Sequence, residues 1–551
     1  MDFRKELVKV LKKHVKKVDE LLSVPPNAKM GDYALPCFTL GKDAHQAAEK
    51  LKDKLKLPKF VSKTEVMGPY LNFFLNKVIF AESVLTSVNK EGKEYGSSKI
   101  GKNKIIAIDY SHPNIAKPFS VGHLRSTVIG NSLYRTLAFV GYKPISCNHL
   151  GDWGTQFGKL IVAYKKWGNK KELEKEPIKH LLKLYVKFHD KESEKLADEA
   201  RAAFKSLEDG NQEYLELWQA FKDLSLKEFQ RIYSILNVMF DSYNGEAFMN
   251  TRIDAAIKKF QKKVRTEISD GALIVDLEKY NMAPVLVRKS DGATTYHTRD
   301  IAAIFYRFNE LKADKLVYVV GQEQKLHFRQ LFKTMELYGY DKDKFLHADF
   351  GHFRLPEGKM STRKGRVIFL EDVLTKSIDL AEKVIKEKNP KLKNRKEVAK
   401  QVGVGAIIFG DLIHDRVKDI EFDRKRILSF DGETAPYVQY THARACSILR
   451  KAGKLGKVSF EHFTHPEELA LITLLDQFPS ILIKVSETYK PHHLAHYLIE
   501  LAQSFNEFYH KCPVISEVKS QMNARLLLVD SVRQVLENGL GLLGIESPKE
   551  M

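Results

Sequence analysis

The stretch 104–142 constrains the fold of this chain more strongly than any other. Its residues 105–108 are an apolar run bounded by polar residues, as in a buried parallel strand. Residues 109–120 are rich in Pro, Asn and Ser, which favours an irregular loop. From Leu124 onward apolar residues recur at helical spacing, and Gly141 follows where a helix C-cap would lie. The sequence therefore predicts a strand, a polar loop and a helix.

The start of that helix is a candidate phosphate site. Gly122 and His123 lie where unpaired N–H groups and the positive end of the helix dipole favour an anion. A Gly-His pair at a helix start is more often a simple cap than a catalytic site. Here, however, the same loop also carries Asn114, Lys117 and Ser120. An amide, a cation and a hydroxyl beside one helix start favour a binding site.

The composition limits the class of protein. A chain of 551 residues predicts roughly three or four domains. Its net charge of +20 favours a polyanionic partner, and we expect nucleic acid rather than a membrane. The four cysteines are far apart without Cys-x-x-Cys spacing, so neither a zinc site nor a disulfide framework is indicated. With no visible targeting segment, we expect a cytoplasmic protein.

Several motifs resemble one family, in that family's order. The run HPNIAKPFSVGHLRST resembles the ATP-binding signature of class I aminoacyl-tRNA synthetases in its arginyl form. Other stretches that resemble the arginyl-tRNA synthetases are GPYLNF, LGDWGTQFG, GKMSTRKG, PYVQYTHARACSIL and the late GLLGI. The resemblance covers essentially the whole chain.

The resemblance implies a fold of α/β plus all-α type in successive parts. Residues 1–100 correspond to a small α/β N-terminal domain that binds the tRNA elbow. Residues 101–370 correspond to the class I Rossmann-like catalytic domain, with a helical insertion at about 167–257. A linker or connecting helix spans 371–400, and a helical-bundle anticodon-binding domain spans 401–551.

The resemblance also assigns the ATP side of the site. The basic loop from Lys359 is similar to the KMSKS loop, which grips the ATP phosphates. The implied catalytic residues are Lys117, His123 and Lys359. The implied ATP-binding residues are Ser120, Gly122, His123, Lys359, Met360, Ser361 and Arg363.

This sequence departs from the class I signatures at two positions. Ser120 stands where the HxGH form has its first histidine, and Thr362 stands where KMSK has its second lysine. Losing one transition-state donor can cost about a hundredfold in rate. We hypothesise that Lys117 replaces the loop lysine, which a normally active Lys117→Ala variant would contradict. No substitute for the histidine is evident from the sequence.

An arginine side chain demands a particular kind of pocket. Its guanidinium is planar, permanently charged and has five donors, so carboxylates and neutral acceptors suit it. By resemblance, the arginine-binding positions are Asn114, Glu246, Tyr296, Asp300 and Gln324. Tyr296 and Asp300 are four positions apart at a predicted helix start and share a face. In isolation such a pair would more often be a cap and a packed aromatic residue.

Two segments are candidate tRNA contacts. Tyr70 and Asn72 alternate on a predicted strand, which would place a ring beside an amide on one face. Tyr437, Tyr440 and Arg444 form an aromatic and basic cluster on a predicted helix, which suits stacking on unpaired bases. The family resemblance agrees with both assignments.

The expected reaction ligates L-arginine to tRNA(Arg) with ATP through arginyl-adenylate, with Mg²⁺ as counter-ion. No resident metal site and no membrane partner are expected. The resemblance also implies a monomer, which is the usual state in the family. Three alternatives stay open. They are a simpler nucleotidyltransferase that needs no tRNA, a non-catalytic RNA-binding relative, and a class I synthetase for another amino acid. Asp300 and Tyr296 disfavour the last for apolar amino acids such as leucine or valine.

Overall fold

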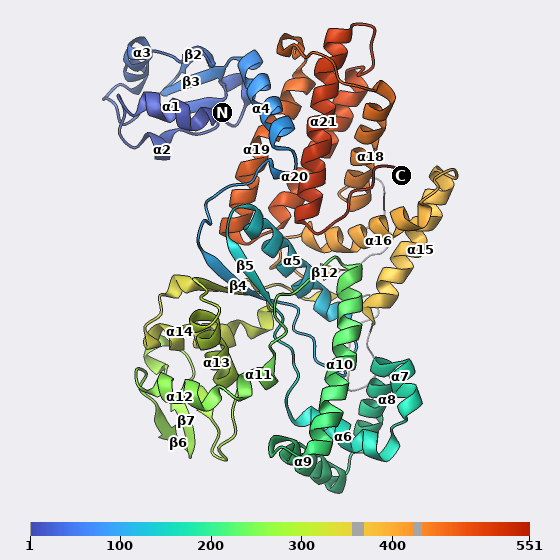
Figure 1. Cartoon of the computed structure of the whole chain (residues 1–551). Helices are drawn as coiled ribbons and strands as arrows, with labels where there is room; N and C mark the ends of the chain where they lie inside the picture. Colours follow the sequence, from blue (N-terminus) through green and yellow to red (C-terminus); the bar gives the residue numbers. More distant parts are fainter. Residues whose placement is uncertain (1, 355–367, 422–428, 430–431) are drawn as a thin grey trace. The chain divides into compact units, whose positions relative to one another are not determined.

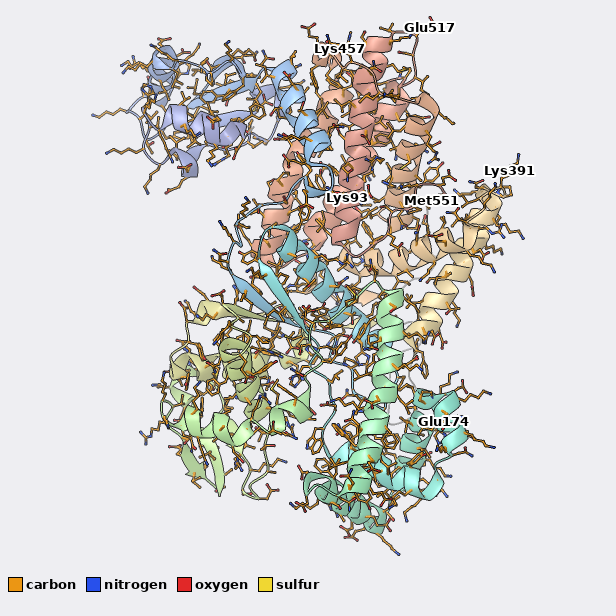
Figure 2. The ribbon with its side chains drawn as sticks, viewed as in Figure 1. Lys93, Glu174, Lys391, Lys457, Glu517 and Met551 are labelled. Carbon is orange, nitrogen blue, oxygen red and sulfur yellow. The ribbon has the colours of Figure 1, made fainter. Side chains whose placement is uncertain are left out.

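The computed structural model describes residues 2–354, 368–421, 429 and 432–551 (Figure 1). The chain divides into two compact units, each made of several segments. The first unit comprises Met1–Tyr95, Arg444–Phe478 and Leu501–Leu536, and the second comprises Gly96–Ala443, Pro479–Glu500 and Glu537–Met551. Charged side chains such as those of Glu174 and Lys391 point away from the ribbon into solvent (Figure 2).

The N-terminal segment begins with two short helices. They are α1 (Phe3–Leu11) and α2 (Val18–Leu21). The amphipathic apolar pattern of residues 3–21 is therefore divided between two helices. Lys17 adopts a positive φ of 56°, which ends regular helical geometry between the two pieces. Phe3 and Leu11 are nevertheless buried, as the amphipathic pattern requires.

A three-stranded antiparallel sheet follows, in the order β1-β3-β2. Its elements, with the helices beside them, are β1 (Tyr33–Pro36), α3 (Ala44–Lys54), β2 (Val61–Met67), β3 (Tyr70–Leu75) and α4 (Lys77–Glu91). The run EVMGPYLNFFLN contains the end of β2, a turn at residues 68–69 and all of β3. Gly68 makes this reversal possible because it adopts a φ of 58°.

The second unit is organised around a four-stranded parallel sheet in the order β10-β9-β4-β5. Its strands are β4 (Ile105–Asp109), β5 (Lys143–Cys147), β9 (Lys315–Tyr318) and β10 (Phe345–His347). Helix α5 (Leu124–Phe139) connects β4 to β5, which confirms the predicted strand, loop and helix. Ile106 and Ile108 are buried because β4 has a parallel strand on each side.

The chain between β5 and β9 carries helices and a small separate sheet (Figure 1). The helices of the expected insertion and those directly around it are α6 (Thr155–Trp167), α7 (Lys170–Lys175), α8 (Pro177–Asp190), α9 (Glu194–Glu208), α10 (Gln212–Ile235), α11 (Glu246–Asn250) and α12 (Ile253–Gln261). The strands β6 (Glu267–Ser269), β7 (Ala272–Val275) and β8 (Val285–Arg288) form an antiparallel sheet of their own. Helices α13 (Tyr296–Asn309) and α14 (Lys325–Tyr338) then flank β9 in sequence.

The described residues of the remaining chain are almost entirely helical, as the resemblance implied for residues 401–551. Its elements are β11 (Phe353–Arg354), α15 (Leu370–Lys388), α16 (Arg395–Leu412), β12 (Ile420–Glu421), α18 (Ala435–Ala452), α19 (Pro466–Thr488), α20 (His492–Lys511) and α21 (Lys519–Leu542). The stretch 371–400, expected as a linker or one connecting helix, forms α15 and the start of α16. These two helices share a small core that includes Ala381, Ile385 and Val402, so the segment is a packed hairpin.

Arg125 of α5 joins distant segments of the second unit. Its side chain is 1% exposed, and its Nε donates to Asp411 Oδ2 at 3.0 Å. Its two Nη groups donate to three backbone carbonyls, those of Gly351 (2.6 Å), Lys418 (2.9 Å) and Arg416 (3.2 Å). A buried guanidinium needs such partners because its desolvation is costly. The start of α5 is thereby fixed to α16 and to the chain around β11 and β12.

We predict that Arg125→Ala lowers the free energy of unfolding of the second unit by about 3–5 kcal/mol, because it leaves the Asp411 carboxylate buried and unpaired. Urea unfolding followed by tryptophan fluorescence measures this, since the chain's 3 tryptophans all lie in the second unit. Arg201→Ala is the control: Arg201 pairs with Asp198 on the surface, where ion pairs contribute little. Equal midpoints for the two variants would contradict the prediction.

Candidate active site

The carboxyl end of β4 carries a buried charged cluster. Asp109 accepts a hydrogen bond from Arg307 Nη2 on α13 at 2.6 Å and one from His112 Nε2 at 2.8 Å. Burial by itself would raise the pKa of Asp109, but the neighbouring Arg307 and His112 outweigh burial and hold that pKa below its usual value. Asp109 is therefore a fixed anion at the edge of the sheet where open α/β folds bind ligands.

The loop after β4 is held by hydrogen bonds from two other elements. Ser111, at a φ of 80°, donates its backbone N–H to Ser126 Oγ on α5 at 2.8 Å. Its hydroxyl lies 2.8 Å from the Thr127 hydroxyl and 2.7 Å from the Tyr233 hydroxyl on α10. The Tyr233 oxygen also accepts from Asn148 Nδ2 at 2.9 Å. The inserted helix α10 therefore fixes both this loop and the loop after β5.

A second set of contacts ties the loop to the insertion. The N–H of Ala116, at a φ of 60°, donates to Ser225 Oγ on α10 at 2.8 Å. The Lys117 ammonium lies 5.5 Å from the centre of the Tyr185 ring on α8, within cation–π range. Asn114 forms a β-bridge with Gly151, and a Cβ at Gly151 would lie 2.3 Å from Asn114 Oδ1. The glycine of LGDWG is therefore needed for this close approach.

His123 is oriented by Ser120 at the start of α5. The backbone N–H of Ser120 donates to His123 Nδ1 at 3.1 Å, and the Ser120 hydroxyl lies 3.3 Å from the same nitrogen. Burial lowers the pKa of His123 to about 4, so the ring is neutral at pH 7. Since Nδ1 accepts a hydrogen bond, the proton resides on Nε2. Gly122 beside it is exposed.

The candidates for an amino-acid pocket lie on three elements. Asp300 on α13 accepts from His327 Nε2 on α14 at 2.7 Å. Glu246, the first residue of α11, has a side chain only 14% exposed and lies 3.9 Å from Arg299 Nη1. Burial raises the pKa of Glu246 to about 7, although Arg299 opposes the shift, and Asp300 is among the charges that contribute to it. Asp300 and Glu246 therefore share one electrostatic environment.

The other two residues expected around this pocket are more open to solvent. Tyr296, at the start of α13, is 71% exposed, and the Arg299 guanidinium lies 5.8 Å from its ring centre. Gln324 ends a short 3₁₀ turn before α14 and is exposed. Arg299 thus links Tyr296 with Glu246, whereas no contact in the described structure joins Gln324 to the other candidates.

The N-terminal candidates differ in their exposure. Tyr70 is 39% exposed and packs edge-to-face against Phe38, which is 59% exposed, with ring centres 5.7 Å apart. Asn72 is only 3% exposed, in the middle strand of the sheet. The expected platform of a ring beside an open amide is therefore incorrect in its geometry, because Asn72 is buried whereas Tyr70 is exposed. The exposed aromatic neighbour of Tyr70 is Phe38.

The candidates on α18 also differ from one another. Tyr440 is 39% exposed, whereas Tyr437 is partly buried. Arg444 donates to Asn506 Oδ1 at 2.5 Å and lies 5.5 Å from the Tyr509 ring centre. Lys359, Met360, Ser361 and Arg363 of the predicted phosphate-gripping loop lie outside the described residues.

Sequence reasoning did not identify several residues of this region. Asp109 directly follows a predicted strand, which is a signal that could have found it. Arg307 is 198 residues from Asp109, and no local pattern indicates that pairing. Tyr233 and Ser225 lie on an amphipathic helix, where they resemble ordinary core positions.

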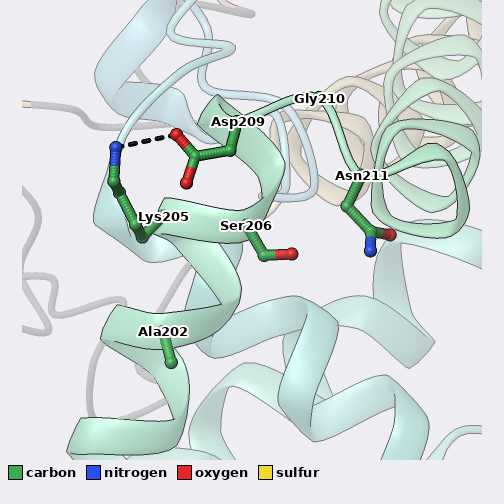
Figure 3. A pocket seen from close by; sticks show the side chains of 6 residues that line it. All are labelled: Ala202, Lys205, Ser206, Asp209, Gly210 and Asn211. Atoms are coloured by element: carbon green, nitrogen blue, oxygen red, sulfur yellow. Dashed lines mark hydrogen bonds and ion pairs between the residues drawn. The ribbon is translucent and has the colours of Figure 1, made fainter.

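A hollow of about 510 Å³ lies away from these residues, on the insertion (Figure 3). Residues at the end of α9 and the start of α10 line it, namely Ala202, Lys205, Ser206, Asp209, Gly210 and Asn211. Within this hollow, Lys205 Nζ forms an ion pair with Asp209 Oδ1 at 2.7 Å. None of the predicted site residues lines this hollow, so it is not the site suggested by the motifs.

Comparison with known families gives matches along the chain. The catalytic-domain model of the class I (R) tRNA synthetases matches residues 84–424. The model of the DALR anticodon binding domain matches residues 438–551, and that of the arginyl tRNA synthetase N-terminal domain matches residues 1–75.

Individual proteins match over the same length. The chain is 48% identical to an arginine–tRNA ligase of Clostridium perfringens, covering 100% of both chains. It is 48% identical to the corresponding ligase of Alkaliphilus metalliredigens, covering 97% of this chain and 96% of that one. Among solved structures, the arginyl-tRNA synthetase of Thermus thermophilus superposes with a TM-score of 0.85 at 27% identity, covering 100% of both chains.

We predict that His123 is the Nε2–H tautomer at pH 7 and becomes protonated only near pH 4, since burial disfavours the imidazolium. Nitrogen NMR of ¹⁵N-histidine-labelled protein measures both properties, and His123→Gln assigns the resonance by removing it. A titration near pH 6.5, the ordinary range of histidine, would contradict the prediction.

Proposed function

This chain belongs to the arginyl-tRNA synthetases, a class I family, and from that premise we propose how its residues carry out the family's reaction. The enzyme ligates arginine to tRNA using ATP. The arginine carboxylate attacks the α-phosphorus of ATP, which gives arginyl-adenylate and releases pyrophosphate. A hydroxyl of the terminal ribose of tRNA(Arg) then takes the arginyl group, which releases AMP.

The ATP side of the site is formed by the loop after β4. Lys117 contributes positive charge, and His123 donates a hydrogen bond from Nε2 to a phosphate oxygen. Gly122 contributes open backbone at the start of α5, where N–H groups attract an anion. Ser120 contributes to ATP binding through His123, which its backbone N–H and hydroxyl orient. Lys359, Met360, Ser361 and Arg363 grip the phosphates from the second signature loop. Catalysis on this side is positioning and charge stabilisation, without a covalent intermediate.

Magnesium enters this scheme with the substrate. Mg²⁺ usually keeps several waters and binds through substrate phosphates rather than through a cage of protein ligands. Within residues 2–354, 368–421, 429 and 432–551, no cluster of three or more His, Cys, Asp or Glu side chains could hold a metal. We therefore write the nucleotide substrate as MgATP.

The arginine side of the site is formed by α11, α13 and the chain before α14. Asp300 pairs with the substrate guanidinium, and its bond from His327 Nε2 (2.7 Å) holds the carboxylate in one orientation. Glu246 provides a second carboxylate, while Tyr296 and Gln324 add neutral acceptors. Asn114, beside Gly151, binds the amino-acid backbone end. A neutral analogue would leave the Asp300 and Glu246 carboxylates without a cationic partner, which gives selectivity for arginine.

The remaining parts of the chain bind tRNA. We assign residues 1–100 to the tRNA elbow, with Tyr70 on the strand concerned, and 401–551 to the anticodon. Tyr437, Tyr440 and Arg444 contribute to the anticodon contact, and the catalytic domain spans 101–370.

The proposal includes a soluble, monomeric, cytoplasmic enzyme. Helix α19 (Pro466–Thr488) is long and apolar enough to cross a membrane by length and composition, with a mean hydropathy of 1.5. The core helix of a soluble protein passes the same test. Leu471, Leu475 and Phe478 of α19 are fully buried, which favours a core role.

Pyrophosphate exchange tests the function. With wild-type enzyme, radioactive pyrophosphate should enter ATP when arginine and tRNA are both present, and with none of the other standard amino acids. Exchange with a different amino acid would show that the pocket is misassigned. Exchange that needs no tRNA would instead favour a simpler nucleotidyltransferase.

We predict that the KM for arginine falls by about tenfold as the pH rises from about 6 to 8. The pKa of Glu246 is raised to about 7 by burial, so its carboxylate is mostly protonated below that pH and mostly charged above it. Only the charged form pairs with the guanidinium. Exchange kinetics measure this KM, and Glu246→Gln should remove the pH dependence. The KM for ATP is the internal control, and a parallel change in it would contradict the assignment.

A further inference from the structure

The ATP signature of this chain lacks one histidine, and Ser120 does not obviously replace it. The Ser120 backbone N–H and hydroxyl both lie against His123 Nδ1, at 3.1 and 3.3 Å. Ser120 therefore orients His123. A second histidine, His112, lies earlier in the same loop and has no role in the mechanism described so far.

The backbone at His112 is held in an unfavourable conformation. Its φ is 51°, in the left-handed region, although Pro113 follows and normally restricts the preceding residue to extended geometry. Ser111 before it is also left-handed, with a φ of 80°. The bonds from Ser111 to α5 and α10 keep this reversal in place. Such strain persists only where the surroundings impose it, and it clusters at functional sites.

The reversal brings the His112 side chain back over the end of β4. Its Nε2 donates to Asp109 Oδ1 at 2.8 Å, while Arg307 fixes the other carboxylate oxygen at 2.6 Å. The side chain is 25% exposed, so the ring is fixed at one edge and open at another. The charges of His112 and Lys117 both act on the His123 ring, which places all three in one electrostatic environment.

We propose that His112 is the phosphate-binding histidine of this enzyme and replaces the signature histidine missing at position 120. As an imidazolium, His112 donates from Nε2 to Asp109 and from Nδ1 to a phosphate oxygen of ATP. No proton leaves the ring. It stabilises the charge that accumulates on the phosphates as arginyl-adenylate forms, alongside neutral His123 and cationic Lys117.

The test compares His112→Gln, Ser120→His and the double variant in pyrophosphate exchange, at saturating tRNA and over a range of arginine concentrations. Glutamine places a donor where Nε2 was, so it keeps the bond to Asp109 and removes the outer donor. We expect kcat of His112→Gln to fall about a hundredfold, with little change in the KM for arginine and in the melting temperature. Ser120→His added to it should restore most of the rate, and Ser120→His alone should change the rate only a few-fold.

The rescue separates a phosphate donor from a structural clamp. A histidine introduced at position 120 cannot repair the bond at Asp109, so it restores the rate only if a donor to ATP was lost. A His112→Gln enzyme with full activity overturns the proposal, and so does a failed rescue by Ser120→His. His465→Ala is the matched control, since His465 also pairs with a carboxylate, that of Glu467, but lies in the first unit. Its activity should equal that of the wild type.

The role of His112 rests on the arginine-activating function proposed above. Wild-type enzyme that fails to exchange pyrophosphate with arginine and tRNA would overturn that function. If the wild-type enzyme exchanges pyrophosphate normally and the His112→Gln variant is equally active, only the role of His112 is overturned.

Discussion

The buried carboxylate of Asp109 is the constraint on which the catalytic unit depends. A charge at the end of a central strand is costly unless it is paired, and both of its oxygens are engaged by side chains from other parts of the chain. Arg307 brings α13 to the end of β4, and α13 also carries Asp300 on the arginine side. His112 brings the phosphate loop back to the same point. One anion therefore positions both halves of the reaction centre.

The inserted helix α10 holds the loops that follow β4 and β5 in place. Ser225 accepts from the N–H of Ala116, and the Tyr233 hydroxyl joins Ser111 to Asn148. Ala116 and Ser111, which these bonds hold in place, have left-handed backbone conformations that isolated loops rarely retain. Since adenylate formation depends on placing groups around ATP, a helix that fixes this loop contributes to catalysis without touching the substrate. The insertion is thus part of the scaffold of the active site.

Burial acts in opposite directions on the pKa values of two groups in the proposed active site. It lowers the pKa of His123 to about 4 and raises that of Glu246 to about 7, because in each case it disfavours the charged form. In the proposed mechanism, the phosphate side therefore receives a neutral donor as well as the cation of Lys117. The arginine side receives a carboxylate that ionises near neutral pH, where a guanidinium can draw it into the charged state.

The sequence by itself determined the strand, loop and helix at 104–142 and the helical C-terminal part. It could do so because apolar periodicity and turn residues act over a few neighbouring positions. The signature motifs likewise identified Lys117, His123 and Asp300 as candidates. Tertiary structure alone decided which charges meet: Asp109 and Arg307 are 198 residues apart, and Arg125 and Asp411 are 286 apart. It also decided that Asn72 is buried and that His112 turns back to Asp109. Such pairings depend on how distant segments pack, and no local pattern encodes them.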